Sequence, residues 1–544
     1  MTKEELERLK TLEIRIHEIA KEMGLLTKDI IFEVVPVKRV IEGMSYGFPD
    51  NFSYWQFGRD WEYYRTIYEY HGGGIPYEQV WNFETPKAFL VETNPFALNV
   101  LVIAHVYGHV DSFLASHYLQ AGRAASDIAS SARSAADRFR FYEQKYGIEE
   151  YENTLDAADS LKTHLPLDIF TNEDVPEDEI REQLLANEHA KLKRNAVNKT
   201  PKKELTKEEI KQGEKKLRWL ARKTPPVPMY DVLLYILRHS EVLRFEPWKA
   251  DVVSEIRDQQ RHLTPQMKTK MGNEGWATYI HVHIMRRLFK EGLLNDKEHD
   301  VFNYYHSRVL AENKYSLNWY RIGYGLFEHI KERWDKGRFG KEYNECTDPH
   351  KKSYWDIHAG LGNKKIFEVR ASYSDRMLVE NFFTDDFIHE QKIYIYNTRI
   401  EQLTGEIIDE IIEDRPEIIR ALLKRSWTLY GNPIIRIENG NYDNNGELQL
   451  THRFSGNYIS ALPYLELNPK SWLEKTLERV YFLWGKTVHL DSFEVPESEL
   501  NPEKEDEIAE IQLVRYSFNG KKHKREKYAD ISFAEGQKIF ERVR

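Results

Sequence analysis

The chain has 544 residues and a formal net charge of −10, with 41% hydrophobic and 31% charged residues. This length predicts two or three domains, and the negative charge argues against wrapping nucleic acid as the main task, because phosphate binding needs a basic field. One cysteine, Cys346, excludes an intramolecular disulfide framework and a cysteine-based zinc site.

The first residues, MTKEELERLKTLEIRIHEIAKEMGLL, predict a charged helix without the apolar stretch of a secretion signal. No uninterrupted run reaches the roughly 18 apolar residues that a membrane helix needs. We therefore expect a cytoplasmic protein without a membrane span.

Residues 1–170 have a mostly helical pattern, in which Asn94 can cap a helix that Pro95 begins. Residues 171–228 are highly charged and end in a proline-rich stretch, which predicts an exposed, partly helical insertion or a mobile segment. Residues 247–265 predict a further helix, and Pro265 is expected to end it.

The pattern changes after about residue 370. Strands are predicted at 392–398 and from 510, a hairpin at 434–453 and an amphipathic helix at 471–485. The predicted fold is a mainly α-helical N-terminal domain (1–370, with the insertion at 171–228), a smaller α+β C-terminal domain (371–500) and a C-terminal extension (501–544).

The most apolar stretch, VLVIAHVYGHVDSF at 100–113, carries two histidines four residues apart. On a helix His105 and His109 lie on one face, the geometry with which H-E-x-x-H metalloproteases hold zinc. The acid of that motif, which activates water, is replaced here by Val106. The alternative is a pair of core histidines, which would each need a hydrogen-bond partner to offset desolvation.

A second helix is predicted over MGNEGWATYIHVHIMRRLFKEGLL at 271–294, begun by Gly272 and Asn273 and ended by Gly292. Glu274 then lies in its first turn and His281 on the same face, whereas His283 points the opposite way. Glu274 and His281 can join His105 and His109 in a mixed nitrogen and oxygen site for zinc, with iron or manganese as alternatives. The alternative for Glu274 is a favourable interaction with the helix dipole.

At these residues the chain resembles the SpoVR (stage V sporulation protein R-like) family. The resemblance is carried by GMSYGFP and YWQFG (43–58), GGIPYEQV (73–80), VIAHVYGHVDSF (102–113), NEGWATYIHVHIM (273–285), YHSRV (305–309) and NWYRIGYGLFEHI (318–330). The chain departs from the family pattern at Trp319, where proline is expected, and at His262, where an aromatic residue is usual.

The resemblance implies a role in sporulation, in spore cortex formation, or in a stress response. It implies a PrkA-type serine kinase and a von Willebrand-like protein as partners, and it does not imply a reaction. The motifs of the family place His105, His109, Glu274, His281 and His306 at matching positions. EGWA also resembles a segment of helical metallopeptidases, whose glutamate is the third zinc ligand; such an analogy does not by itself carry function.

Two hypotheses follow. In the first, His105, His109 and Glu274 bind a divalent metal, with His281 as the fourth ligand or as a hydrogen-bonding partner of the ligands. The reaction would be metal-assisted hydrolysis of an amide in a peptide or cell-wall precursor, with Glu274 or His306 as catalytic base; oxidative chemistry at iron is the other option. In the second, the cluster is structural and the protein acts by binding a kinase or stress partner.

A serine hydrolase site is a weaker alternative. GMSYG (43–47) matches a nucleophile elbow around Ser45, and HGGG (71–74) matches an oxyanion motif. The two occur in the wrong order along the chain, and the elbow lacks its preceding buried strand. Tight glycine turns explain both stretches better.

Overall fold

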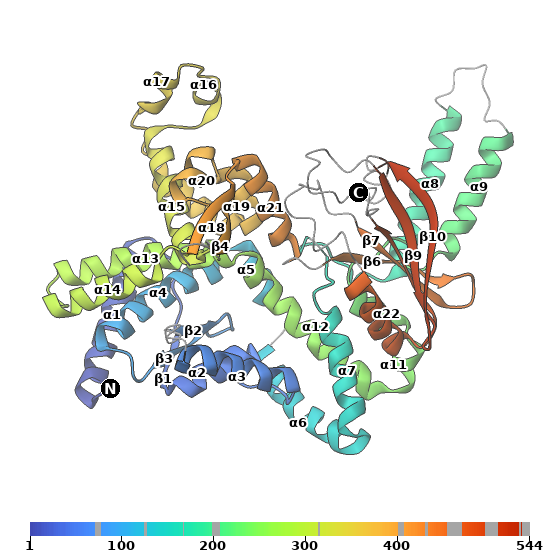
Figure 1. The fold of residues 1–544 in the computed structure, drawn as a ribbon, viewed down its shortest axis with the longest axis horizontal. Helices are drawn as coiled ribbons and strands as arrows, with labels where there is room; N and C mark the ends of the chain where they lie inside the picture. Colours follow the sequence, from blue (N-terminus) through green and yellow to red (C-terminus); the bar gives the residue numbers. More distant parts are fainter. Residues whose placement is uncertain are drawn as a thin grey trace. The chain divides into compact units, whose positions relative to one another are not determined.

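The computed structural model describes residues 1–70, 78–123, 128–166, 168–197, 207–313, 316–400, 407–429, 433–453, 470–494, 510–532 and 535. The chain forms two compact units, each built from two segments. The first unit contains residues 1–141 and 261–428, and the second contains 142–260 and 429–544. The ribbon is shown in Figure 1.

The first unit is mainly helical. Its first segment contains α1 (Lys3–Glu22), β1 (Ile31–Val35), α2 (Val37–Tyr46), α3 (Trp55–Tyr70), β2 (Glu78–Trp81), β3 (Lys87–Val91), α4 (Phe96–Ala115), α5 (His117–Arg123) and most of α6 (Ile128–Tyr146). Its second segment contains the end of α12 (Pro247–Lys268), α13 (Lys270–Lys290), α14 (Asp296–Val309), α15 (Trp319–Lys336), α16 (Gly340–Asn344), α17 (Pro349–Ser353), α18 (Gly362–Ser372), α19 (Asp375–Phe382), α20 (Asp385–Gln391), β4 (Ile395–Ile400), β5 (Ile407–Glu413) and α21 (Pro416–Leu429).

A small sheet lies next to α4 in this unit. Its strand order is β1-β3-β2, with β1 parallel and β2 antiparallel to β3. Glu78, the first residue of β2, pairs with Leu90 near the end of β3. Because β3 leads directly into α4, this register brings the start of β2 close to the helix that carries the two histidines.

Helix α4 forms the centre of the core. Every residue from Ala97 to Phe113 is buried. By length and composition α4 could cross a membrane, yet 94% of its apolar window is buried inside the protein, as in any core helix. The helix is apolar on all sides because other elements surround it.

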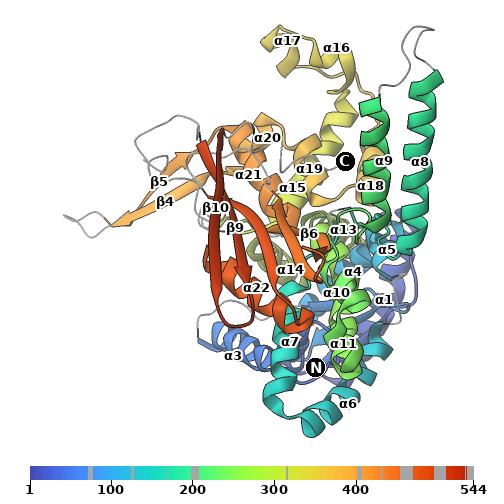
Figure 2. The same ribbon diagram turned by 90° about the vertical axis from the view of Figure 1, so that its right-hand side faces the viewer.

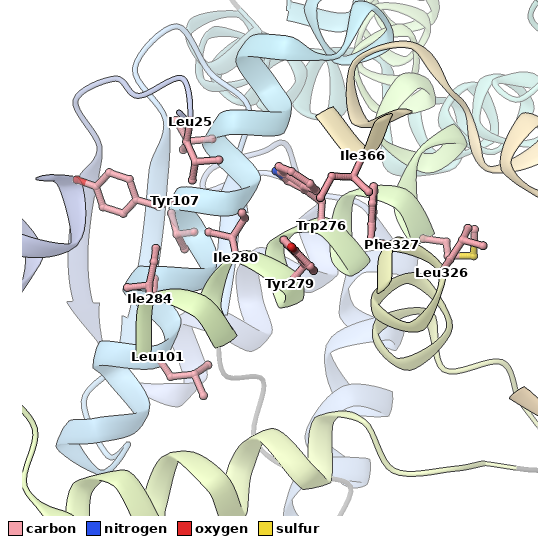
Figure 3. Close-up of a cluster of buried hydrophobic side chains, with 14 of the residues drawn as sticks. Leu25, Leu101, Tyr107, Trp276, Tyr279, Ile280, Ile284, Leu326, Phe327 and Ile366 are labelled. Atoms are coloured by element: carbon pink, nitrogen blue, oxygen red, sulfur yellow. The ribbon is translucent and has the colours of Figure 1, made fainter. Parts of the chain in front are cut away.

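Helix α13 packs against α4 on one side and α15 on the other. Two glycines allow this close approach: a Cβ on Gly108 of α4 would lie 2.6 Å from the Cα of Ala277, and a Cβ on Gly275 would collide with the backbone of Gly323 in α15. Figure 3 shows the hydrophobic cluster of this region, with Trp276, Ile280 and Phe327 among its side chains.

The second unit combines helices with a five-stranded sheet. It contains the start of α12, α7 (Ile148–Leu161), α8 (Glu177–Val197), α9 (Lys207–Arg222), α10 (Val232–His239), α11 (Glu241–Phe245), β6 (Ile434–Tyr442), β7 (Glu447–Arg453), α22 (Lys470–Trp484), β8 (Val488–Glu494), β9 (Glu510–Phe518) and β10 (His523–Ser532). The strand order is β10-β9-β8-β7-β6, antiparallel except between β7 and β8. Helix α22 packs on this sheet, and α8 and α9 lie side by side (Figure 2).

The predicted fold class is confirmed: the protein is mainly helical, with strands β6–β10 in its C-terminal part. The hairpin at 434–453 and the helix at 471–485 form as predicted, and the charged insertion contains the helices α8 and α9. The predicted boundary at residue 370 does not coincide with a boundary of the compact units, and the domain division stays a prediction.

Three predicted helix ends are wrong. Pro265 does not end α12, which continues to Lys268; the proline lies in the last turn, where one missing backbone donor costs little. Helix α13 begins at Lys270, so Glu274 lies beyond its first turn. Helix α4 begins at Phe96, and the Asn94 side chain bonds to Asn99 instead of capping.

Candidate metal centre

Two histidines and two glutamates converge in the first unit. One potential ligand atom from each of Glu78, His105, His109 and Glu274 lies within 4.8 Å of all the others. The histidine side chains are 3% exposed, and the glutamate side chains are 14% and 16% exposed. The cluster is therefore buried and is made of the residue types that bind divalent transition metals.

The four distances between histidine nitrogens and carboxylate oxygens are close to those around a tetrahedral ion. Oε1 of Glu78 lies 3.1 Å from Nε2 of His105 and 3.5 Å from Nε2 of His109. Oε2 of Glu274 lies 3.5 Å and 3.4 Å from the same two nitrogens. Ligands about 2.0–2.1 Å from a zinc ion at tetrahedral angles are about 3.3–3.4 Å apart.

Three elements place these side chains. Helix α4 stacks His105 and His109 one turn apart, with ring centroids 4.6 Å from each other. Helix α13 brings Glu274 opposite them, because Gly108 has no side chain that would hold α4 away from Ala277 of α13. Strand β2 adds Glu78 through its pairing with β3.

In the metal-free cluster the two carboxylates favour protonated, positively charged histidines. Burial opposes the charged form of each group, but the opposite charges across the cluster outweigh it. The pKa of His109 is raised to about 10, chiefly by Glu274, and that of His105 is raised, chiefly by Glu78. The same interactions lower the pKa of Glu78 and of Glu274. A dication bound there would be neutralised by the two carboxylates.

The hydrogen bonding of the cluster is incomplete. Nε2 of His105 and Oε2 of Glu274 are buried and lack a hydrogen-bond partner among the described residues, although they lie within ion-pair distance of the cluster. Buried polar atoms without partners are rare and costly. Both atoms face the centre of the cluster, where a metal ion would satisfy them.

His281 is not one of the four converging residues. Its Nδ1 lies 2.8 Å from Nδ1 of His105, and its Nε2 lies 3.1 Å from Nδ1 of His306. Of the two roles predicted for His281, this position favours the hydrogen-bonding partner over the fourth ligand. His306, a predicted catalytic base, is separated from the cluster by His281.

Tyr320 of α15 lies beside the cluster, with its ring centroid 5.9 Å from that of His105. Burial, followed by the charges of Glu274 and Glu78, raises the pKa of its phenol well above the usual value. The phenol therefore stays protonated and is a neutral hydrogen-bond donor next to the carboxylates.

The sequence indicated three of the four cluster residues, His105, His109 and Glu274, and missed Glu78. Glu78 lies in GGIPYEQV, one of the stretches that carry the family resemblance. No sequence spacing links a single acidic residue to a helix far along the chain, so its place in the cluster was not predictable. Residues 71–77, which include the HGGG stretch, lie outside the described part of the chain. Ser45 is buried within α2 and donates its hydroxyl to the carbonyl of Ile41, so it does not occupy a strand-to-helix elbow.

The fold and the cluster together define a mainly helical protein with a buried two-histidine, two-glutamate cluster that could bind a metal ion. The chain belongs to the family described as SpoVR like protein, whose model matches residues 3–432. The family resemblance expected from the motifs is thus confirmed.

The chain is also similar to a bacterial protein, "Uncharacterized protein YcgB" of Escherichia coli (strain K12). The two are 25% identical over 494 residues, which cover 88% of this chain and 90% of that relative. No solved structure matches the chain.

Proposed function

We propose that this protein is a divalent-metal-dependent hydrolase that cleaves an amide bond in a peptide or cell-wall precursor. Zinc is the proposed metal, with iron or manganese as alternatives. The observation that carries the proposal is the set of four buried ligand atoms with distances of 3.1–3.5 Å between histidine nitrogens and carboxylate oxygens.

In this proposal His105, His109 and Glu274 hold the metal. A bound dication polarises a carbonyl group and lowers the pKa of water. In this proposal Glu78 supplies the carboxylate that the histidine helix lacks at Val106, and its role is to accept the proton of the attacking water. Glu78 replaces Glu274 and His306 as the preferred base, because Glu274 is needed as a ligand and His306 lies behind His281.

The family supports a cellular context for this activity. We propose action in spore cortex formation or in a stress response, in the cytoplasm, together with a PrkA-type serine kinase and a von Willebrand-like protein. These parts of the proposal depend on the family resemblance alone.

A second candidate function is supported by one observation, the presence of four protein donors. Structural zinc sites have four protein ligands, whereas catalytic sites use three and keep one position for water or substrate. If Glu78 is a ligand, the centre is structural, and the protein acts by binding its partners.

Metal analysis separates these functions. The purified protein should contain about one equivalent of metal, and the double variant His105→Ala, His109→Ala should contain none. In the hydrolase, Glu78→Gln should retain the metal and lose cleavage of a fluorogenic peptide mixture. Loss of the metal in Glu78→Gln, without cleavage by the wild type, would favour the structural centre. A metal-free wild type would exclude both.

A further inference from the structure

Three histidines form a hydrogen-bonded chain that begins at the cluster. Nδ1 of His105 contacts Nδ1 of His281 at 2.8 Å, and Nε2 of His281 contacts Nδ1 of His306 at 3.1 Å. His105 and His281 are 2% and 1% exposed, while His306 is only partly buried. The chain therefore runs from the buried cluster on α4, through α13, to a partly exposed residue on α14.

Counting protons gives this chain a direction. A neutral imidazole has one N–H, so each ring donates through one nitrogen and accepts through the other. If Nε2 of His105 offers its lone pair to a metal, the proton of His105 is on Nδ1 and is donated to Nδ1 of His281. His281 then carries its proton on Nε2 and donates it to Nδ1 of His306.

The second histidine of the cluster has no such support. Nδ1 of His109 is buried and lacks a hydrogen-bond partner among the described residues. Metal-binding histidines usually donate their other ring nitrogen to a partner that fixes the tautomer and the ring orientation. Of the two histidines, only His105 has that partner among the residues that the structure describes.

We infer that His281 and His306 are positioning residues, which hold His105 in the tautomer that presents Nε2 to the metal. This inference rests on the proposed metal centre. It assigns to His281 and His306 a role in metal affinity, through His105, and not in contact with the metal or the substrate.

The hydrogen-bonded chain requires a neutral His281. A protonated His281 would carry N–H groups on both nitrogens and could not accept from His105. The neutral ring thus has one donor and one acceptor, as the chain requires.

Zinc affinity tests the inference. His281→Phe keeps a ring of similar size but removes both hydrogen bonds, and the dissociation constant for Zn²⁺, measured by competition with a chromogenic chelator, should rise about 10–100-fold. His283→Phe is the matched control, since His283 lies two residues along the same helix and its ring bonds to the carbonyl of Tyr279, not to the cluster. Its zinc affinity should stay close to that of the wild type, because His283 does not support a ligand of the metal.

Nitrogen NMR of the wild type gives an independent readout that does not require a variant to fold. In the zinc-loaded protein the protonated nitrogens should be Nδ1 of His105, Nε2 of His281 and Nε2 of His306. The opposite proton arrangement, or a His281→Phe protein that binds zinc as tightly as the wild type, would overturn the inference. A wild type that binds no zinc would instead refute the metal centre itself.

Discussion

Asp111 accepts a hydrogen bond of 2.8 Å from the indole N–H of Trp276. Each residue lies two positions after a member of the cluster, Asp111 after His109 and Trp276 after Glu274. The bond therefore fixes the register of α4 against α13 directly beside the candidate metal centre. Asp111 also accepts from the backbone N–H of Leu26 and forms a 3.0 Å ion pair with Arg370.

Replacement of Asp111 should cost much more stability than replacement of its indole partner. Asp111→Ala leaves the buried Arg370 without its counter-charge, so we expect a loss of about 3–5 kcal/mol in the free energy of unfolding. Trp276→Phe keeps most of the ring and removes one hydrogen bond to a charged group, for about 1.5–3 kcal/mol. Urea unfolding of both variants measures the difference. Equal losses would mean that the ion pair contributes nothing beyond the indole bond.

Gly275→Ala should destabilise the first unit and weaken metal binding together. Its Cβ would collide with the backbone of Gly323, which cannot move as a side chain can, so α13 and Glu274 must shift. We expect a loss of about 1–3 kcal/mol or more, as for overpacked cores. The control is Gly58→Ala, because that helical glycine has open space around its Cβ position and alanine is the better helix former. Thermal unfolding and zinc titration check both variants; unchanged behaviour of Gly275→Ala would refute the close helix contact.

Metal affinity should increase as the pH rises. In the metal-free protein the pKa of His109 is raised to about 10, so its ring holds both protons at neutral pH, and the pKa of His105 is raised in the same direction. The metal needs the neutral rings, and binding must release those protons. Between pH 6 and 8 the dissociation constant for Zn²⁺ should therefore fall steadily with no plateau. Calorimetry in buffers of different ionisation enthalpy counts the released protons. If zinc binding releases no proton, the cluster histidines are not protonated in the metal-free protein.

His262→Phe should stabilise the protein, most strongly in acid. His262 is 2% exposed and packs near Phe48 and Phe83. The backbone of Gly122 is close, but neither ring nitrogen has a hydrogen bond of good geometry among the described residues. Phenylalanine has no ring nitrogens that need hydrogen-bond partners, so the free energy of unfolding should rise by about 1–3 kcal/mol.

The pH dependence of this gain has a definite sign. Burial lowers the pKa of His262 from 6.5 to about 4, so the unfolded chain binds the proton more tightly. The histidine protein thus loses stability as the pH falls from about 6.5 to about 4, and the variant lacks this loss. Unfolding curves at pH 7, 5.5 and 4.5 test it. A stability difference that stays constant over this range would show that His262 is not the titrating group.

Local sequence patterns were sufficient for most of the fold. The i, i+4 spacing of His105 and His109, the amphipathic pattern of α22 and the Asn/Gly-rich turn between β6 and β7 each depend on neighbours within one element. Glu274 could also be named, because its helix is recognisable. The ends of helices were less predictable: the continuation of α12 through Pro265 depends on how little one lost hydrogen bond costs in a last turn.

The composition of the cluster required long-range information. Glu78 reaches it only because β2 pairs antiparallel with β3 in one particular register. His281 lies on the expected face of α13, but its distance to the cluster depends on the separation of α4 and α13, which Gly108 keeps small. No spacing within a single element encodes that separation.

The segments of the first unit are separated along the chain by residues 142–260. During translation, both histidines and Glu78 leave the ribosome well before Glu274. A nascent or truncated product that stops before α13 has three of the four donors. It lacks Glu274 and the helix that packs against Gly108. The four donors can therefore converge only after α13 has been synthesised, and a metal bound by all four would report that the two distant segments have assembled.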